Sequence, residues 1–162
     1  AKAYLSTLTK TIAANTTIMN THNPLLDALL SKKYEEASRK GVMVYFDLPD
    51  LRDMPMDQTD LVIVLSNLLN NAIEAAAQAD PPEIYVRMRK SEEEVVLSVR
   101  NRVKEELNLV DGQLPRISQK GAGHGFGLWN VQDVLKKYGG EYTISCRGCW
   151  FRFTCTIPLR KL

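Results

Sequence analysis

The 162-residue sequence has no uninterrupted apolar stretch near the roughly 20 residues that a membrane span requires. Its first ten residues, AKAYLSTLTK, lack the apolar core of a signal peptide. Neither sign of charge dominates, since 21 Lys and Arg stand against 19 Asp and Glu, so charge alone indicates neither a nucleic acid nor a membrane partner. With 44% hydrophobic and 25% charged residues, the composition is that of a globular domain with one core.

Cysteine is also scarce, being limited to Cys146, Cys149 and Cys155. An odd number of closely spaced cysteines is typical of reduced thiols rather than of a disulfide scaffold. Cys146 and Cys149 form a C-x-x-C, but no nearby His or second Cys pair supplies the remaining ligands of a zinc site. We therefore expect two thiols that flank a tight turn at Arg147–Gly148.

Capping and periodicity predict where the helices lie. Asn23 is a suitable N-cap before Pro24, and Gly41 ends that helix. Asp57 is a candidate cap for a second helix that runs to about Ala79, and a third helix covers 128–138. The apolar stripe of the first helix consists of Leu25, Leu26, Leu29, Leu30, Tyr34 and Ala37.

Alternating side chains predict five strands, at 42–48, 83–90, 95–101, 141–146 and 149–157. The second and third strands, and likewise the fourth and fifth, are separated by short turns and should form hairpins. Phe151, Phe153, Cys155 and Ile157 should face inward. Because strands do not alternate strictly with helices, the order favours an α+β two-layer sandwich, a mixed sheet with helices on one face.

Three asparagines interrupt an otherwise good helix in the stretch NLLNNAIEAA, residues 67–76. Asn competes for backbone hydrogen bonds, and three of them in place of good helix formers cost about 1–2 kcal/mol. At 100° per residue, Asn67, Asn70, Asn71 and Glu74 form one narrow stripe. A solvated outer face explains its polarity but not the choice of Asn. Short amide oxygens suit Mg²⁺, so the stripe indicates a metal–phosphate site, with Glu74 expected to be solvated.

A glycine cluster, GAGHGFG at 121–127, precedes the third helix. It follows a stretch from Val103 to about Ala122 that is long for a loop without function. Glycines let the backbone approach an anion, and a helix N-terminus presents free N–H groups. The spacing is neither a Rossmann fingerprint nor a P-loop. Taken alone, the cluster is either a phosphate cradle or a flexible connector.

Asn101 ends a strand on the same face as Val95, Leu97 and Val99, the face that should pack against helices. A buried amide needs a hydrogen-bonding partner. The edge of an adenine ring can supply one, because it offers a donating amino group and an accepting nitrogen. A hydrogen bond to the following turn is the alternative.

These elements, in this order, resemble the GHKL ATPase superfamily, which includes histidine kinases. Residues 67–72 resemble the N box, and GHGFGL at 123–128, running on to KYGG at 137–140, resembles the G2 box and its helix. Residues 21–42 are similar to the segment that leads into the kinase domain of Agr-type and dicarboxylate-sensing sensor kinases. The resemblance covers about residues 21–160 and implies the Bergerat fold, with ATP and Mg²⁺ bound between helices and a lid.

The resemblance implies a role for each matching residue. Asn71 would coordinate the Mg²⁺ that bridges the ATP phosphates, and Asn67 would line the same pocket one turn earlier. The loop 103–122 would be the ATP lid, and Lys120 at its end would contact phosphate. The residues assigned to nucleotide binding are Asn101, Gly123, His124, Gly125, Gly127 and Leu128.

Two departures from the family pattern stand out. The G1 box usually reads Asp-x-Gly-x-Gly, but here Asn101 takes the Asp position and no glycines follow. An amide oxygen still accepts a hydrogen bond from adenine, but without charge assistance, at about half the strength. Of the two histidines, His22 precedes a helix cap and His124 lies in the glycine cluster, so neither is expected to accept a phosphoryl group.

The expected function is phosphoryl transfer from Mg-ATP to a histidine on a dimerisation helix outside this chain, which alone would be inactive. Residues 1–20 would be the end of that helix and 21–162 the catalytic domain. The expected context is a membrane-anchored, homodimeric bacterial sensor with a response regulator, this domain lying in the cytoplasm and binding no nucleic acid.

Two alternatives remain open on the sequence: a GHKL serine kinase of the anti-sigma-factor type, and a nucleotide-responsive interaction module with little catalysis. An ATPase that performs conformational work is disfavoured. Such enzymes use a Glu general base at the first N-box position, which is Asn67 here.

Overall fold

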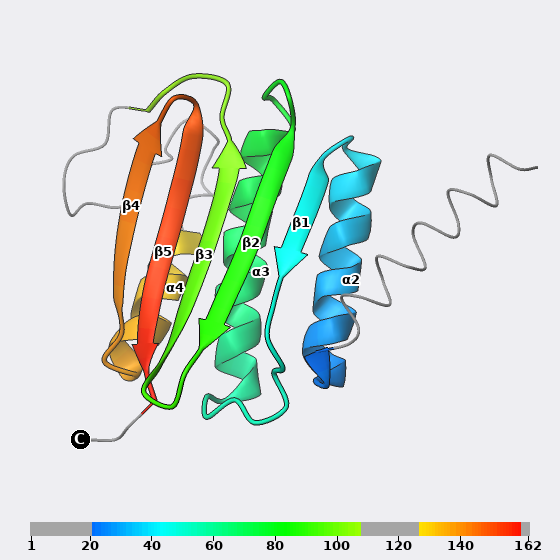
Figure 1. Cartoon of the computed structure of the whole chain (residues 1–162). Coiled ribbons are helices and arrows are strands. Elements are labelled where there is room, and N and C mark those ends of the chain that lie inside the picture. Colours follow the sequence, from blue (N-terminus) through cyan, green and yellow to red (C-terminus); the bar gives the residue numbers. More distant parts are fainter. Residues whose placement is uncertain (1–20, 108–126, 160–162) are drawn as a thin grey trace, which may run out of the picture.

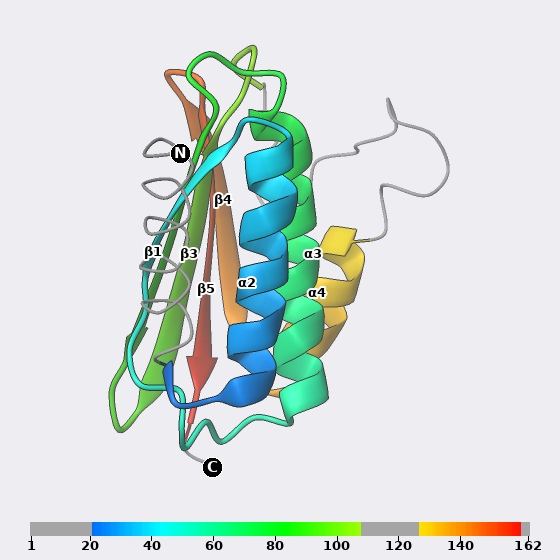
Figure 2. The same ribbon diagram turned by 90° about the vertical axis from the view of Figure 1, so that its right-hand side faces the viewer.

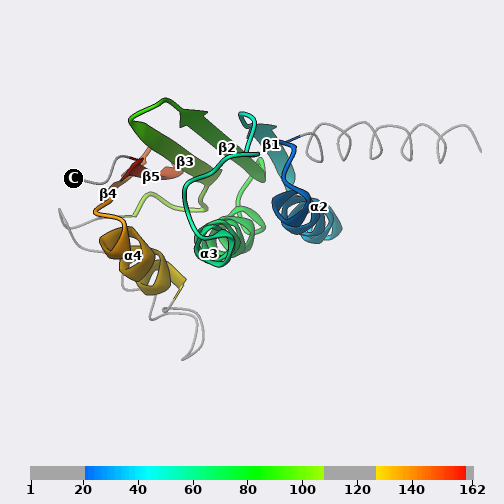
Figure 3. The same cartoon turned by 90° about the horizontal axis from the view of Figure 1, so that it is seen from below.

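The computed structural model describes residues 21–107 and 127–159. A five-stranded sheet forms one layer, and helices α2, α3 and α4 lie against one of its faces (Figures 1 and 3). The predicted two-layer α+β sandwich is confirmed. Predictions for residues 1–20, 108–126 and 160–162 lie outside the described residues. Among the described helices, none is both long and apolar enough to cross a bilayer.

Helix α2, Pro24–Arg39, begins and ends where its capping residues predict. The Asn23 side chain accepts a hydrogen bond from the Leu26 N–H at 3.2 Å, and Gly41 follows the helix with φ of +73°. Leu26 and Leu30 are fully buried, but Leu25 is 48% exposed, contrary to the prediction. The apolar stripe read from the sequence was too wide, because only one side of α2 is covered, by α3 and the sheet (Figure 2).

Helix α3, Gln58–Ala76, starts at the predicted cap: the Asp57 carboxylate accepts from the Thr59 N–H at 2.7 Å. It ends three residues before the predicted Ala79. The N–H groups of Gln78 and Ala79 bond to carbonyls three residues back rather than four, so the chain tightens into a turn before Pro81. Helix α4, Gly127–Lys137, packs beside α3 (Figure 3).

The sheet has the order β1-β2-β3-β5-β4. Strands β2 and β3 form one antiparallel hairpin and β4 and β5 the other, as predicted. Strand β1 pairs with β2 in parallel, because α3 carries the chain back to the same end of the sheet between them. The strand bounds are Met43–Asp47 for β1, Glu83–Lys90 for β2, Glu94–Arg102 for β3, Glu141–Arg147 for β4 and Trp150–Pro158 for β5.

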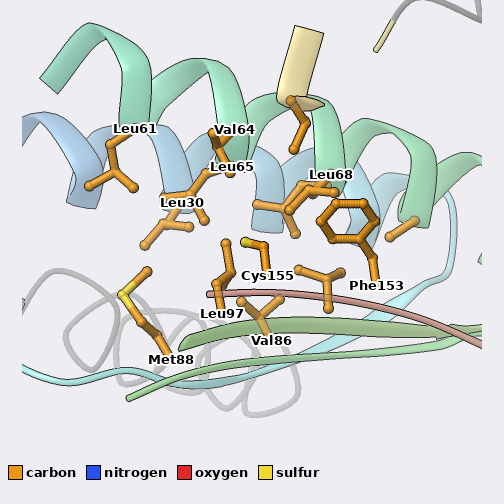
Figure 4. Packing of buried hydrophobic residues seen from close by; sticks show 14 of the residues in the cluster. Leu30, Leu61, Val64, Leu65, Leu68, Val86, Met88, Leu97, Phe153 and Cys155 are labelled. Atoms are coloured by element: carbon orange, nitrogen blue, oxygen red, sulfur yellow. The ribbon is translucent and has the colours of Figure 1, made fainter. Parts of the chain in front are cut away.

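The core lies between α3 and the inner face of the sheet (Figure 4). The predicted alternation holds, since Ile84, Val86 and Met88 are buried on β2 while Arg87 and Arg89 are exposed. Strand β5 directs Phe153, Cys155 and Ile157 into the core, and Phe151 packs at its margin. Burial of this one face fixes the register of every strand. The three cysteines are free. The turn between β4 and β5 consists of Gly148 and Cys149, one residue later than predicted, so Cys149 is part of the turn and Cys146 lies within β4.

Candidate functional site

Gly127, the first residue of α4, lies against Asn67 and Asn71 of α3. A Cβ atom added at Gly127 would come within 3.2 Å of Asn67 Oδ1 and 3.6 Å of Asn71 Nδ2. Absence of a side chain at this position therefore lets the start of α4 approach both amides closely. A helix N-terminus carries free N–H groups and a partial positive charge, so this junction can hold an anion.

The amide of Asn71 has an unsatisfied donor. Its Nδ2 atom is buried and has no hydrogen-bond partner in the part of the chain that the structure describes. Asn67 differs, because its Nδ2 donates to the Ile63 carbonyl of its own helix at 2.7 Å. A buried donor without an acceptor costs about 1–3 kcal/mol. A ligand oxygen at the junction would satisfy Asn71 Nδ2.

Asn70 takes no part in this junction. It accepts a hydrogen bond of 2.7 Å from the Lys33 ammonium group, which comes from α2 and also donates to Glu36 at 3.1 Å. The predicted single stripe thus divides: Asn67 and Asn71 face α4, whereas Asn70 faces α2. Lys33 was not predicted from the sequence, although its spacing of three and four residues from Leu30 and Ala37 places it on the buried stripe.

Glu74, the last residue of the predicted polar stripe, is half-buried rather than fully solvated. Together with Asn70 and Ile73 of α3, it lines a hollow of about 430 Å³ between α2 and α3. The other side of this hollow is formed by Glu36, Arg39 and Lys40.

Asn101 is 3% exposed and lies on the inner face of β3, as predicted. Its Nδ2 donates to the Arg102 carbonyl at 3.0 Å, so its Oδ1 is left to accept a further bond. Asn101 is the next-to-last residue of β3, and helix α3 and strand β3 run in the same direction in Figure 1. No hydrogen bond joins Asn101 to Asn67, Asn71 or Gly127 among the described residues.

The other predicted site residues divide into two groups. Leu128 is 4% exposed and belongs to the core cluster, so its side chain anchors the start of α4 and only its backbone can meet a ligand. The rest lie outside the described residues: Lys120, Gly123, His124 and Gly125.

The far ends of α3 and α4 are joined by a polar cluster that fixes the angle between the helices. Asp60 accepts from Lys137 at 2.8 Å and from the Tyr138 hydroxyl at 2.6 Å, while that hydroxyl accepts from the Asp57 N–H at 3.1 Å. The hydrogen bond from Lys137, followed by that from Tyr138, lowers the pKa of Asp60 below its ordinary value. This cluster holds α4 in the orientation that places its N-terminus on Asn67.

Comparison with known proteins decides the family. The family model described as the GHKL domain matches residues 56–158, which include α3, α4 and the junction between them. The chain belongs to the GHKL domain family. Membership agrees with the N box and G2 box resemblance read from the sequence.

Curated relatives of this GHKL domain include two sensor proteins. CitS of Bacillus subtilis (strain 168) is 28% identical over 150 residues, which are 88% of this chain and 27% of CitS. PhoQ of Escherichia coli O157:H7 is 28% identical over 125 residues, 73% of this chain and 24% of PhoQ. The chain thus spans about a quarter of the length of these relatives.

Solved histidine kinase structures share the fold. The catalytic domain of histidine kinase ThkA superposes with a TM-score of 0.61 at 24% identity, covering 82% of this chain and 92% of that one. Histidine kinase AdeS of Acinetobacter baumannii superposes with a TM-score of 0.60 at 17% identity, covering 98% of this chain and 80% of that one. The fold of this GHKL domain is therefore that of histidine kinase catalytic domains.

Proposed function

We propose that this chain is the ATP-binding catalytic domain of a sensor histidine kinase. The observation that carries the proposal is the meeting of Asn67 and Asn71 with the first residue of α4 in a GHKL domain. Two amides, a buried donor without an acceptor and a helix N-terminus converge there. A triphosphate with its magnesium ion is a ligand that uses all three.

Mg²⁺ fits this site together with phosphates rather than alone. Within residues 21–107 and 127–159, no group of three or more His, Cys, Asp or Glu side chains could hold a metal ion. Asn71 Oδ1 is a hard oxygen donor, and Mg²⁺ commonly takes one or two protein ligands, several waters and the phosphates of a nucleotide. When bound, the ion would neutralise charge on the phosphates. We expect Mg²⁺ without ATP not to bind.

The chain's own groups would position ATP rather than react with it. N–H groups in the first turn of α4 and Asn71 Nδ2 would hold phosphate oxygens, and Asn101 Oδ1 would accept from the adenine amino group. Lys120, Gly123, His124 and Gly125 stay predictions for the lid and the phosphate cradle. Positioning and charge neutralisation supply most of the catalysis in phosphoryl transfer.

We infer that the acceptor is a histidine ring nitrogen on a dimerisation helix of the full-length protein. The bond from the γ-phosphorus to the ADP oxygen breaks as the phosphorus–nitrogen bond forms. Residues 1–20 would be the end of that helix. The full-length protein would be a homodimeric, membrane-anchored sensor that passes the phosphoryl group to a response regulator, with this domain in the cytoplasm.

Calorimetric titration with ATP, with and without Mg²⁺, tests the binding site. The wild-type chain should bind ATP in the micromolar to millimolar range, and more tightly with Mg²⁺. Asn71→Ala should abolish the effect of Mg²⁺, and Asn101→Ala should reduce the preference for ATP over GTP. Asn70→Ala is the matched control, since the adjacent side chain faces α2. Unchanged Mg²⁺ dependence in Asn71→Ala would refute the site.

The reaction needs a second experiment, in which the chain and radiolabelled ATP are mixed with a purified dimerisation-helix fragment from the same full-length protein. Acid-labile phosphate on the fragment is expected. Acid-stable phosphate on serine would instead indicate the serine kinase. If ATP binds but no phosphate is transferred to histidine or serine, the chain is a nucleotide-responsive interaction module.

A further inference from the structure

The face of the sheet opposite the helices is rich in arginine and aromatic residues. Every described helix packs on the other face, so this outer face is uncovered by the described elements (Figure 3). A hollow of about 690 Å³ crosses β1, β2, β3 and β5 on this face. Its polar and aromatic lining, termed here the arginine face, includes Tyr45, Asp47, Tyr85, Arg87, Arg89, Arg100 and Arg152.

Positive charge is in excess on the arginine face. Asp47 pairs with Arg89 at 2.7 Å and lies 3.7 Å from Arg87 Nε. Arg100 and Arg152 form no ion pair with a carboxylate among the described residues. They are nevertheless direct partners in the register of β3 and β5, on the same face. Like charges placed opposite each other destabilise a sheet, so this pair is a folding cost that a bound anion would relieve.

Aromatic rings hold two guanidinium groups on this side of the sheet, those of Arg100 and Arg102. Arg100 lies 4.5 Å from the centre of the Tyr85 ring and 4.8 Å from that of Trp150, and Arg102 lies 4.2 Å from the Trp150 ring. Cation–π contacts of this kind restrict the side chain before any ligand arrives. A preorganised guanidinium forms paired hydrogen bonds to a carboxylate at a lower entropy cost.

The same contacts argue against a nucleic acid. Proteins that bind single strands stack bases on free aromatic faces. Here Trp150 already packs against two guanidinium groups, and Tyr85 stacks on Tyr45 with ring centres 4.7 Å apart. Tyrosine, tryptophan and arginine are instead the residues enriched at the energetic centres of protein interfaces.

We propose that the arginine face docks a protein partner through an acidic segment whose carboxylates pair with Arg100 and Arg152. The contact lies on the opposite side of the sheet from Asn67, Asn71 and Gly127, so it is separate from the proposed nucleotide site. It is independent of the proposed function, because charge and geometry on the sheet alone carry it.

Trp150 provides the readout for a test. The sequence contains two tryptophans, so Trp129→Phe leaves Trp150 as the only one. In this background, a glutamate 20-mer is titrated and Trp150 fluorescence followed, alongside a 20-residue Gly-Ser peptide, a thymidine 20-mer and phosphatidylglycerol vesicles. The glutamate peptide should give a saturable change that weakens as salt rises, and the Gly-Ser peptide none.

Paired variants assign the effect to the arginine face. Arg100→Gln with Arg152→Gln should weaken binding of the glutamate peptide about tenfold or more, by loss of two charge-assisted contacts. Lys32→Gln with Lys136→Gln removes the same charge from exposed positions on α2 and α4, and should change the affinity less than about twofold. ATP binding should be the same in both double variants.

Three outcomes would overturn the proposal: no saturation by the glutamate peptide, equal weakening in both double variants, or tighter binding of the thymidine 20-mer or the vesicles. None of these bears on the nucleotide site, which is measured separately by the ATP titration.

Discussion

At the scale of single residues, three closely spaced asparagines of α3 have two different surroundings. Asn67 and Asn71 meet the start of α4, whereas Asn70 receives the buried ammonium group of Lys33. The poor helix propensity of Asn is therefore offset in part by a tertiary hydrogen bond, and not only by a ligand. A helical wheel places these asparagines on one polar stripe, but it is too coarse to show that Asn71 faces α4 while Asn70 faces α2.

Substitution of Gly127 tests whether the close approach of α4 to Asn67 matters for ATP binding. A methyl group there would lie 3.2 Å from Asn67 Oδ1, which is tight but can be relieved by a shift of a few tenths of an ångström. Gly127→Ala should leave the free energy of unfolding within about 1 kcal/mol of wild type, since the better helix propensity of Ala offsets the contact. ATP affinity should fall several-fold. Urea denaturation and calorimetry measure the two, and unchanged affinity would contradict the proposed cradle.

The Lys33–Asn70 bond gives a prediction about stability alone. Lys33 is 8% exposed, so Asn70→Ala leaves a buried ammonium group with Glu36 as its remaining hydrogen-bond partner. The free energy of unfolding should fall by about 1–2 kcal/mol. Lys33→Met, combined with Asn70→Ala, should recover part of the loss, because no buried charge remains to be satisfied. A double variant less stable than Asn70→Ala would show that the ammonium group is not the cause.

At the scale of elements, much of the fold follows from local sequence. Asn23 and Asp57 cap their helices, and alternation along β2 and β3 places Ile84 and Asn101 on the inner face. Strand order could not be read in the same way. That β5 lies between β3 and β4 depends on pairing across tens of residues, for which the local pattern carries no information. The exposure of Leu25 was missed for the same reason, since it depends on which neighbours cover α2.

The candidate site was predictable in part. Amide residues and a glycine before a helix indicate phosphate binding from their chemistry. The structure brings Asn67 and Asn71 next to Gly127, as expected, while phosphate binding there stays a prediction. The arginine face was not recognised in the sequence. Arg100 and Arg152 are 52 positions apart in the sequence and become neighbours only through the register of β3 and β5.

The polar cluster between α3 and α4 predicts a pH dependence. Tyr138→Phe removes a hydroxyl that bonds Asp60 and the Asp57 N–H, and should lower the free energy of unfolding by about 1–2 kcal/mol at pH 7.

The pKa of Asp60 is lowered in the folded state, so the stabilisation by its carboxylate is present above the ordinary pKa of 3.8 and is lost as the pH falls below that value. Urea denaturation at pH 7 and pH 3 should show the difference between wild type and Lys137→Met shrinking at the lower pH. An equal difference at both values would mean that Asp60 does not titrate with the cluster.

At the scale of the whole molecule, one core unites the two layers, and Cys155 reports on its integrity. Its side chain is 1% exposed, and burial raises the pKa of its thiol to about 12. In the native chain a thiol reagent should therefore modify Cys146 and Cys149, which are half-buried, and reach Cys155 only after unfolding. Mass spectrometry of a labelling time course in urea should place Cys155 labelling on the same curve as loss of circular dichroism.

The raised thiol pKa of Cys155 also sets a limit on stability at high pH. The unfolded thiol ionises near pH 8.5, whereas the folded thiol ionises near 12, so stability is complete below about pH 8.5 and falls progressively above it. At pH 10 this thiol should cost about 1–2 kcal/mol relative to pH 8. Other groups also titrate there, so the control is Cys155→Val, which fills a similar volume and cannot ionise. If wild type and Cys155→Val lose stability in parallel between pH 8 and pH 10, the thiol is not buried in the folded core.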